Sequence, residues 1–149
     1  MNLPDFFNPQ KLSISQRNID EILSLNKEMH KDSLTLAEDD AKAILKTRDK
    51  LLNNLGRVDI NLDTTKKIII SFSSSAFIND ENYLFILNDL QEAFYYIKNE
   101  TEDAIGDDKI IGLMKDAFEN QCEGSIELLN VNLEKFARNF RSGRISDNE

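Results

Sequence analysis

The most apolar stretch of the chain runs from Tyr83 to Ile97 and reads YLFILNDLQEAFYYI. At the helical period of 100° per residue, its aliphatic and aromatic residues form one buried stripe: Leu87, Leu90, Phe94 and Ile97. Phe85 and Tyr96 project from the far side of the same helix. A helix that is apolar around most of its circumference is usually surrounded by other helices. The pattern therefore predicts a central helix that the rest of the chain encloses.

Start and stop signals predict further helices on both sides of this segment. Thr35-Leu-Ala-Glu38 has the spacing of a capping box, and Gly56 is typical of the left-handed residue that ends a helix. The other helix starts are predicted at side chains that can accept a hydrogen bond from an unpaired amide: Ser13 or Ser15, Asp63, Asn79, Asp107 and Ser125.

The segment after Asp63 allows two interpretations. Thr65, Ile68, Ile69 and Phe72 recur at helical spacing, whereas the alternating apolar residues between positions 68 and 72 would also suit a strand. A single strand would have no partner in this chain. We therefore expect a helix that begins at Asp63 and is ended by the three serines at positions 73 to 75.

These elements predict an all-α fold, a single compact domain of about six helices around the central apolar helix. Its expected limits are residues 13–143, with an irregular N-terminal arm at residues 1–12 and a frayed tail at residues 144–149. Phe6 and Phe7 on the arm are expected to dock on the core or on a partner.

Composition and charge exclude several functional classes. The 149 residues are 40 % hydrophobic and 30 % charged, with a net charge of −9, so nucleic acid is an unfavourable partner. Cys122 is the single cysteine and His30 the single histidine, which leaves no Cys-rich zinc site and no internal disulfide. No apolar run is long enough for a membrane span. We expect a cytoplasmic protein without a cofactor or a metal site.

Arg48 is the most informative single position. It interrupts the apolar stripe of the second helix, between Ile44 and Leu52. Three roles are possible for its side chain. Its stem could lie across the core while the guanidinium reaches solvent, or the guanidinium could form a buried ion pair with an acid on a helix. It could also form a binding site for a carboxylate or phosphate ligand. Glu100, beside the apolar face of the central helix, is the leading candidate for its partner.

Two charged segments lie near the ends of helices. The segment KNETEDAIGDD is rich in acids, and four cations without an acid among them close the last helix: Lys135, Arg138, Arg141 and Arg144. Cations stabilise a helix C-terminus, which explains much of this pattern. The same basic edge could also dock an acidic partner or the acidic segment of a second copy.

Several longer stretches carry a family resemblance: LTLAEDDAKAILKTRDKLLNNLGRVD, AFYYIKNE, DDKIIGLMKDAFE and LEKFARNFRSG. From Ser13 to Gly143 the chain resembles a family of small bacterial proteins of unknown function. The resemblance implies a bacterial protein and assigns no catalytic residue.

The sequence thus favours a non-catalytic helical protein–protein interaction or adaptor module, with another protein or a second copy as its partner. The alternative is a small-anion-binding protein or an enzyme that uses Arg48 with a nearby carboxylate. The expected binding residues are Arg48, Glu100, Arg138, Arg141 and Arg144.

Overall fold

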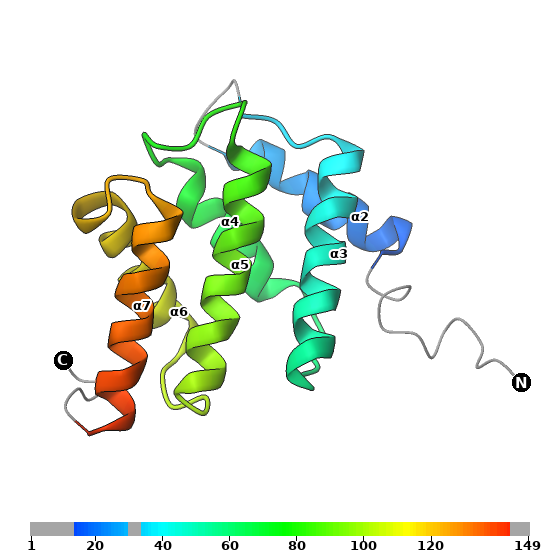
Figure 1. Ribbon diagram of the computed structural model, residues 1–149. Helices are drawn as coiled ribbons and strands as arrows, with labels where there is room; N and C mark the ends of the chain where they lie inside the picture. Colours follow the sequence, from blue (N-terminus) through cyan, green and yellow to red (C-terminus); the bar gives the residue numbers. More distant parts are fainter. Residues whose placement is uncertain (1–13, 30–33, 144–149) are drawn as a thin grey trace, which may run out of the picture.

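The central helix predicted from the sequence is α5, Tyr83–Glu100, and it contacts four other helices. The computed structural model describes residues 14–29 and 34–143. In this part of the chain α5 lies between α3 (Glu38–Leu55) and α7 (Ile126–Arg141), with α4 (Asp63–Ser73) and α6 (Asp107–Asp116) packed behind it (Figure 1). The predicted all-α architecture is confirmed.

The remaining elements complete the bundle. Helix α2, Gln16–Leu23, packs on α3 and continues into a 3₁₀ turn at Ser24–Lys27. Helix α6 continues into a π-helical segment at Ala117–Gln121, and the described residues contain six α-helices and no strand. The predicted arm and tail, including Phe6 and Phe7, lie outside the described residues.

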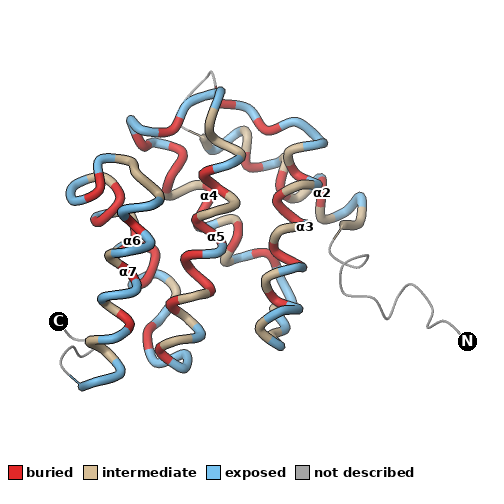
Figure 2. Tube along the Cα trace, viewed as in Figure 1, coloured by how far each residue is buried: buried red, intermediate tan, exposed pale blue. Residues whose placement is uncertain are grey.

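Burial follows the predicted periodicity. Leu87, Leu90, Phe94 and Ile97 are each at most 2 % exposed, while Phe85 is 67 % exposed, as expected for the far side of α5. Buried stretches alternate with less buried ones along α5 in Figure 2. In α4 the burial pattern decides between helix and strand. Ile68 and Ile69 are adjacent and both buried, which suits a helix and excludes the alternation of a half-buried strand.

Two of the predicted helix starts are correct in detail. The hydroxyl groups of Ser15 and Ser125 accept hydrogen bonds from the amides of Asn18 and Leu128. Gly56 ends α3 in the left-handed conformation, as predicted.

The predicted capping box at Thr35 is wrong. Helix α3 begins at Glu38, and the carboxylate of Asp40 accepts the amide hydrogen of Ala37. The cause is a long-range contact, because the Asn26 side chain forms two hydrogen bonds with the main chain of Leu36 and holds that segment outside the helix.

The cap of α5 also differs from the prediction. Asn82 occupies the N-cap position, and the side chain of Asn79 instead accepts the amides of Glu81 and Asn82 in the preceding turn.

Candidate functional site

Arg48 is buried, with 3 % of its surface exposed, so its head does not reach solvent. Its Nη2 atom donates to the main-chain carbonyls of Asp59 and Asn61 at 2.7 and 3.0 Å, and its Nη1 atom lies 3.6 Å from a carboxylate oxygen of Asp49. Carbonyls and a neighbouring carboxylate are the acceptors that a buried guanidinium requires. Arg48 therefore ties α3 to the connector between α3 and α4.

The connector at residues 57–62 is fixed by two further contacts. The hydroxyl group of Tyr95 on α5 donates to the Asp59 carboxylate, and Arg57 forms a bidentate pair with Asp103. Burial, followed by the hydrogen bond to Asp59, raises the pKa of Tyr95. The Arg57 guanidinium holds the pKa of Asp103 below its usual value. The connector is thus restrained by Tyr95 in the core and, at its first residue, by Asp103 in the turn between α5 and α6.

Because Arg57, Asp59 and Asn61 have these anchoring contacts, the residues between them project outward. Val58 is 85 % exposed and Ile60 is 98 % exposed. Neither residue was among the binding residues expected from the sequence. Two β-branched residues that alternate with polar ones in a connector were the one visible signal of this site.

A cavity of about 490 Å³ lies beside the exposed pair. Arg48 and Asp49 contribute polar groups to it, Leu52 and Leu62 contribute apolar surface, and the connector forms another side. Its lining also includes Asn18 of α2 and Asn53 of α3. The cavity can therefore accept an apolar group and hydrogen-bond to a polar one.

Glu100 does not pair with Arg48, and that predicted pairing is wrong. Its carboxylate accepts a hydrogen bond from Arg141 at 2.8 Å, because α5 and α7 bring their C-terminal ends together. Arg138 is exposed in the last turn of α7, where a cation suits the helix dipole. Arg144 lies outside the described residues.

The acidic segment around Glu100 is largely neutralised within the chain. Asp103 pairs with Arg57, Asp107 with Lys98 at 2.7 Å, and Asp108 with Lys67 at 3.1 Å. The segment therefore carries less unpaired negative charge than its sequence suggested. This weakens its attraction for the basic end of a second copy.

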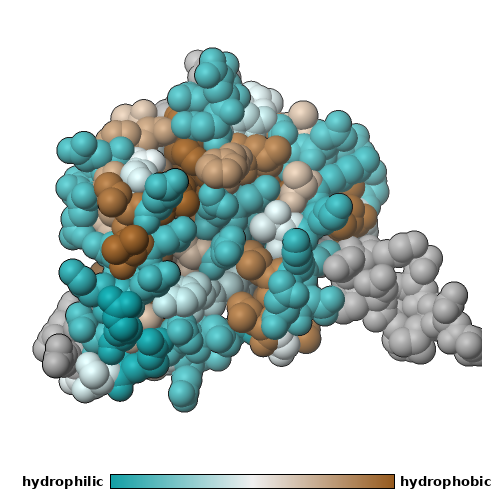
Figure 3. All heavy atoms as spheres, viewed as in Figure 1, coloured by the Kyte–Doolittle hydropathy of each residue, from teal (hydrophilic) through white to brown (hydrophobic). Residues whose placement is uncertain are grey.

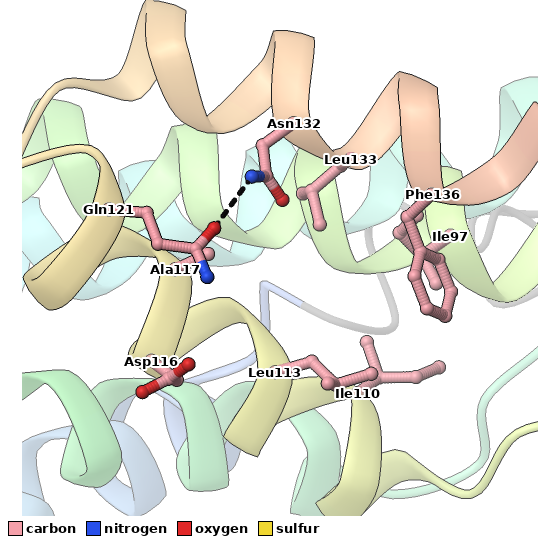
Figure 4. Close-up of a pocket in the computed structure, with 9 residues that line it drawn as sticks. All are labelled: Ile97, Ile110, Leu113, Asp116, Ala117, Gln121, Asn132, Leu133 and Phe136. Carbon is pink, nitrogen blue, oxygen red and sulfur yellow. Dashed lines mark hydrogen bonds between the residues drawn. The ribbon is translucent and has the colours of Figure 1, made fainter. Parts of the chain in front are cut away.

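A second, smaller cavity of about 180 Å³ lies between α5, α6, the π-helical segment and α7 (Figure 4). Ile97, Ile110 and Leu133 form its buried apolar part. Gln121 and Asn132 come together at its edge, where the Asn132 amide donates to the Gln121 side-chain oxygen at 2.8 Å. No pattern in the sequence linked these two side chains, because Gln121 belongs to the π-helical segment and Asn132 to α7. Their contact depends on how the two elements pack.

The single cysteine and the single histidine of the chain provide no evidence of a reactive site. Cys122 is buried, and burial raises the pKa of its thiol, which disfavours a reactive thiolate. His30 lies outside the described residues. Within residues 14–29 and 34–143, no three His, Cys, Asp or Glu side chains gather as a metal site would require. None of the helices described here is long and apolar enough to cross a membrane.

A family model matches residues 21–146 of the 149-residue chain. The chain belongs to the family described as "Family of unknown function (DUF6323)". This match confirms the resemblance to an uncharacterised family. Comparisons with curated proteins and with solved structures gave no match. The geometry of the connector and of the two cavities is therefore the basis for inferring the function.

Proposed function

We propose that this protein is a non-catalytic helical protein–protein interaction module that docks its partner through Val58 and Ile60. The observation that carries the proposal is their exposure, 85 % and 98 %, on a connector anchored by Arg48, Tyr95 and Arg57. We extend the proposal to the bacterial cytoplasm, where the single cysteine of the chain would stay reduced.

Two contributions to the binding free energy favour docking at Val58 and Ile60. Exposed aliphatic side chains gain free energy when a partner removes them from water. Association also costs conformational entropy, and a connector that is already restrained loses less of it than a loose loop would. The neighbouring 490 Å³ cavity offers a place for a side chain of the partner, as interface anchors commonly require.

The partner best supported is a different protein with a neutral or basic surface around an apolar side chain. The chain carries a net charge of −9, so a second copy would bring like charges together. Scattered hydrophobic side chains on the face over α3, α5 and α7 are separated by hydrophilic ones (Figure 3). The hydrophilic side chains thus break up the apolar surface that self-association through that face would need.

Site-specific photo-crosslinking tests the docking site. A benzophenone amino acid replaces Ile60 in one variant of the full chain and Leu128 in another, and both are expressed in the source cells. Leu128 is the matched control because it is also apolar and 55 % exposed, on α7. We expect one dominant adduct from position 60 and none of comparable yield from position 128.

The protein in the adduct is then purified and titrated with the Ile60→Ser and Leu128→Ser variants. Loss of an interface anchor is expected to weaken binding by about 30-fold for Ile60→Ser, against less than about twofold for Leu128→Ser. The reverse order would overturn the connector as the docking site. A homodimer that dissociates in Ile60→Ser, measured by sedimentation velocity, would overturn the proposal of a different protein as partner.

A second candidate function is binding of a small anion in the cavity beside Arg48. The specific observation in its favour is that Arg57 and Arg48 both line this cavity. Sulfate and phosphate stabilise folded proteins in general, so binding would appear as a larger rise in melting temperature over chloride, at equal ionic strength, for the unchanged chain than for Arg57→Gln. The same rise in both proteins would exclude this candidate.

A further inference from the structure

The 180 Å³ cavity combines a buried apolar interior with a polar edge (Figure 4). Ile97 and Ile110 are each 1 % exposed and Leu133 is 4 % exposed, so the interior is well shielded from water. An engineered apolar cavity of about 150 Å³ is sufficient to bind benzene. The interior therefore has the size and polarity to hold a body comparable to one aromatic ring.

The polar edge presents two complementary groups. One hydrogen bond joins Asn132 Nδ2 to Gln121 Oε1 at 2.8 Å, which leaves Gln121 Nε2 as a donor and Asn132 Oδ1 as an acceptor. Figure 4 shows both side chains at the same end of the cavity, across from Leu113 and Ile110. A ligand head that both accepts and donates would match this pair.

The third polar side chain, Asp116, restricts the charge of that head. Its exposed carboxylate lines the same cavity and accepts a hydrogen bond from Asn120 at 2.8 Å. A nearby negative charge disfavours a carboxylate or phosphate ligand. A neutral head group has no such penalty.

We propose that this cavity binds a small neutral molecule with an apolar body and a carboxamide-type head. The body lies among Ile97, Ile110 and Leu133, and the head exchanges hydrogen bonds with Gln121 and Asn132. The site is separate from the connector, and it does not depend on the interaction function proposed above.

The local backbone explains how Gln121 reaches this position. Ala117–Gln121 is a π-helical segment, closed by a hydrogen bond from the amide of Cys122 to the carbonyl of Ala117 at 2.8 Å. Glu123 follows with φ of 48°, an uncommon conformation for a residue with a side chain. Such π-helical insertions and local strain are frequent at functional sites.

Three probes with the same ring size test the proposal on the full-length protein: benzamide, benzoate and toluene. Benzamide offers the neutral donor–acceptor head, benzoate offers an anion, and toluene offers no head. A compound of this size is expected to bind with Kd of about 1 mM. At roughly three times Kd, where toluene is still soluble, it should raise the melting temperature by about 2–3 °C. We expect the melting temperature to rise most with benzamide, less with toluene and least with benzoate.

Variants locate the binding. Ala117→Leu and Leu133→Phe each add a larger side chain to the cavity lining, so they should abolish the rise in melting temperature with benzamide and toluene. Asn130→Ala changes an exposed residue of α7 that does not line this cavity, and it should preserve the rise. Gln121→Ala should weaken the binding of benzamide and leave the binding of toluene unchanged. This substitution requires no repacking of the cavity interior. Asp116→Asn should strengthen the binding of benzoate, because it removes the nearby negative charge.

Amide chemical shifts in two-dimensional NMR give a second readout for every variant that folds. Perturbations by benzamide at residues around the cavity, reduced in Gln121→Ala, are expected. Benzoate shifts equal to those of benzamide, or benzamide binding that survives in both filled variants, would overturn the proposal. If neither filled variant folds, an undiminished benzamide response in Gln121→Ala is the result that overturns it.

Discussion

Arg48 and Asp59 are joined through the main chain, with Nη2 of Arg48 donating to the carbonyl oxygen of Asp59 at 2.7 Å. The carboxylate of the same Asp59 accepts a hydrogen bond from Tyr95. Two buried side chains, one from α3 and one from α5, thus fix a single connector residue through its backbone and its side chain. The position of the exposed Ile60 is therefore coupled to the packing of the core.

Arg48→Met should strongly reduce the free energy of unfolding. The change removes the donor for two main-chain carbonyls and leaves the buried Asp49 carboxylate without this cation. Removing one partner from a buried charged group usually costs about 3–5 kcal/mol. Urea denaturation, followed by circular dichroism, measures the loss.

Two further variants separate charge from packing. Arg48→Lys keeps the charge but lacks the forked donors that reach both carbonyls, so most of the loss should remain. Lys46→Met changes an exposed cation two residues earlier in α3 and should cost less than about 0.5 kcal/mol. A loss below about 1 kcal/mol for Arg48→Met would contradict the structural role assigned to this arginine.

Alkaline pH should destabilise the fold through Tyr95 and Tyr83. Burial and the hydrogen bond to Asp40 raise the pKa of Tyr83 to about 12, and burial with the hydrogen bond to Asp59 raises that of Tyr95. Tyrosines of the unfolded chain ionise near pH 10, whereas these two stay protonated in the folded protein. The stabilisation is complete below about pH 10 and decreases as pH rises towards 12 and above.

Denaturation at a series of pH values from about 9 to 12 measures this slope. Each group that ionises only on unfolding contributes about 1.4 kcal/mol per pH unit at most. Tyr95→Phe and Tyr83→Phe should each make the decrease shallower, and the double variant should make it shallower still. An unchanged slope in the double variant would show that other groups control alkaline unfolding.

The helices were predictable because their signals are local. The apolar stripe of α5, the N-caps Ser15 and Ser125, and Gly56 each depend on residues within a few positions of one another. The start of α3 was mispredicted because its determinant, Asn26, contacts Leu36 from ten residues away. Local capping patterns contain no information about such a contact.

The candidate sites were harder to predict because their partners are main-chain atoms or distant side chains. The hydrogen-bond acceptors of Arg48 include carbonyls 11 and 13 residues later in the chain, and a carbonyl has no residue-type signature. Glu100 was placed on the correct helix, but the ends of α5 and α7 converge and give it Arg141 as a partner. Only the relative placement of the helices decides such a pairing.

A buried polar group at the centre of the bundle provides another test. Gln91 on α5 accepts a hydrogen bond from the Thr65 hydroxyl of α4 at 2.8 Å and donates to the Ile44 carbonyl of α3 at 3.1 Å. Gln91→Leu leaves the buried Thr65 hydroxyl without this acceptor, so we expect a loss of about 2–3 kcal/mol in chemical denaturation.

A double-mutant cycle isolates this hydrogen bond. Thr65→Val alone should also destabilise the fold, because it leaves the Gln91 side-chain oxygen without its donor. The double variant Thr65→Val/Gln91→Leu removes both polar groups, and it should cost at least about 1 kcal/mol less than the sum of the single changes. Strict additivity would mean that the two side chains contribute independently.

Three glycines with different surroundings should respond differently to alanine. Gly124 has φ of 81°, and a Cβ atom there would lie 2.5 Å from the Phe77 side chain. Gly56 has φ of 65° with open space around it, and Gly112 lies within α6, also in open space. Gly124→Ala therefore combines backbone strain with a steric clash, Gly56→Ala has strain alone, and Gly112→Ala has neither.

We expect Gly56→Ala to cost about 1–2 kcal/mol, as a left-handed conformation requires, and Gly124→Ala to cost more, because Phe77 must also move. Gly112→Ala should stabilise the fold by about 0.5–1 kcal/mol through helix propensity. The Phe77→Gly background is the decisive control, because it removes the Cβ, Cγ and Cδ1 atoms that a Cβ at position 124 would meet but keeps the strain at that position. In that background Gly124→Ala should cost no more than Gly56→Ala does. An unchanged difference would mean that Phe77 does not press on this turn.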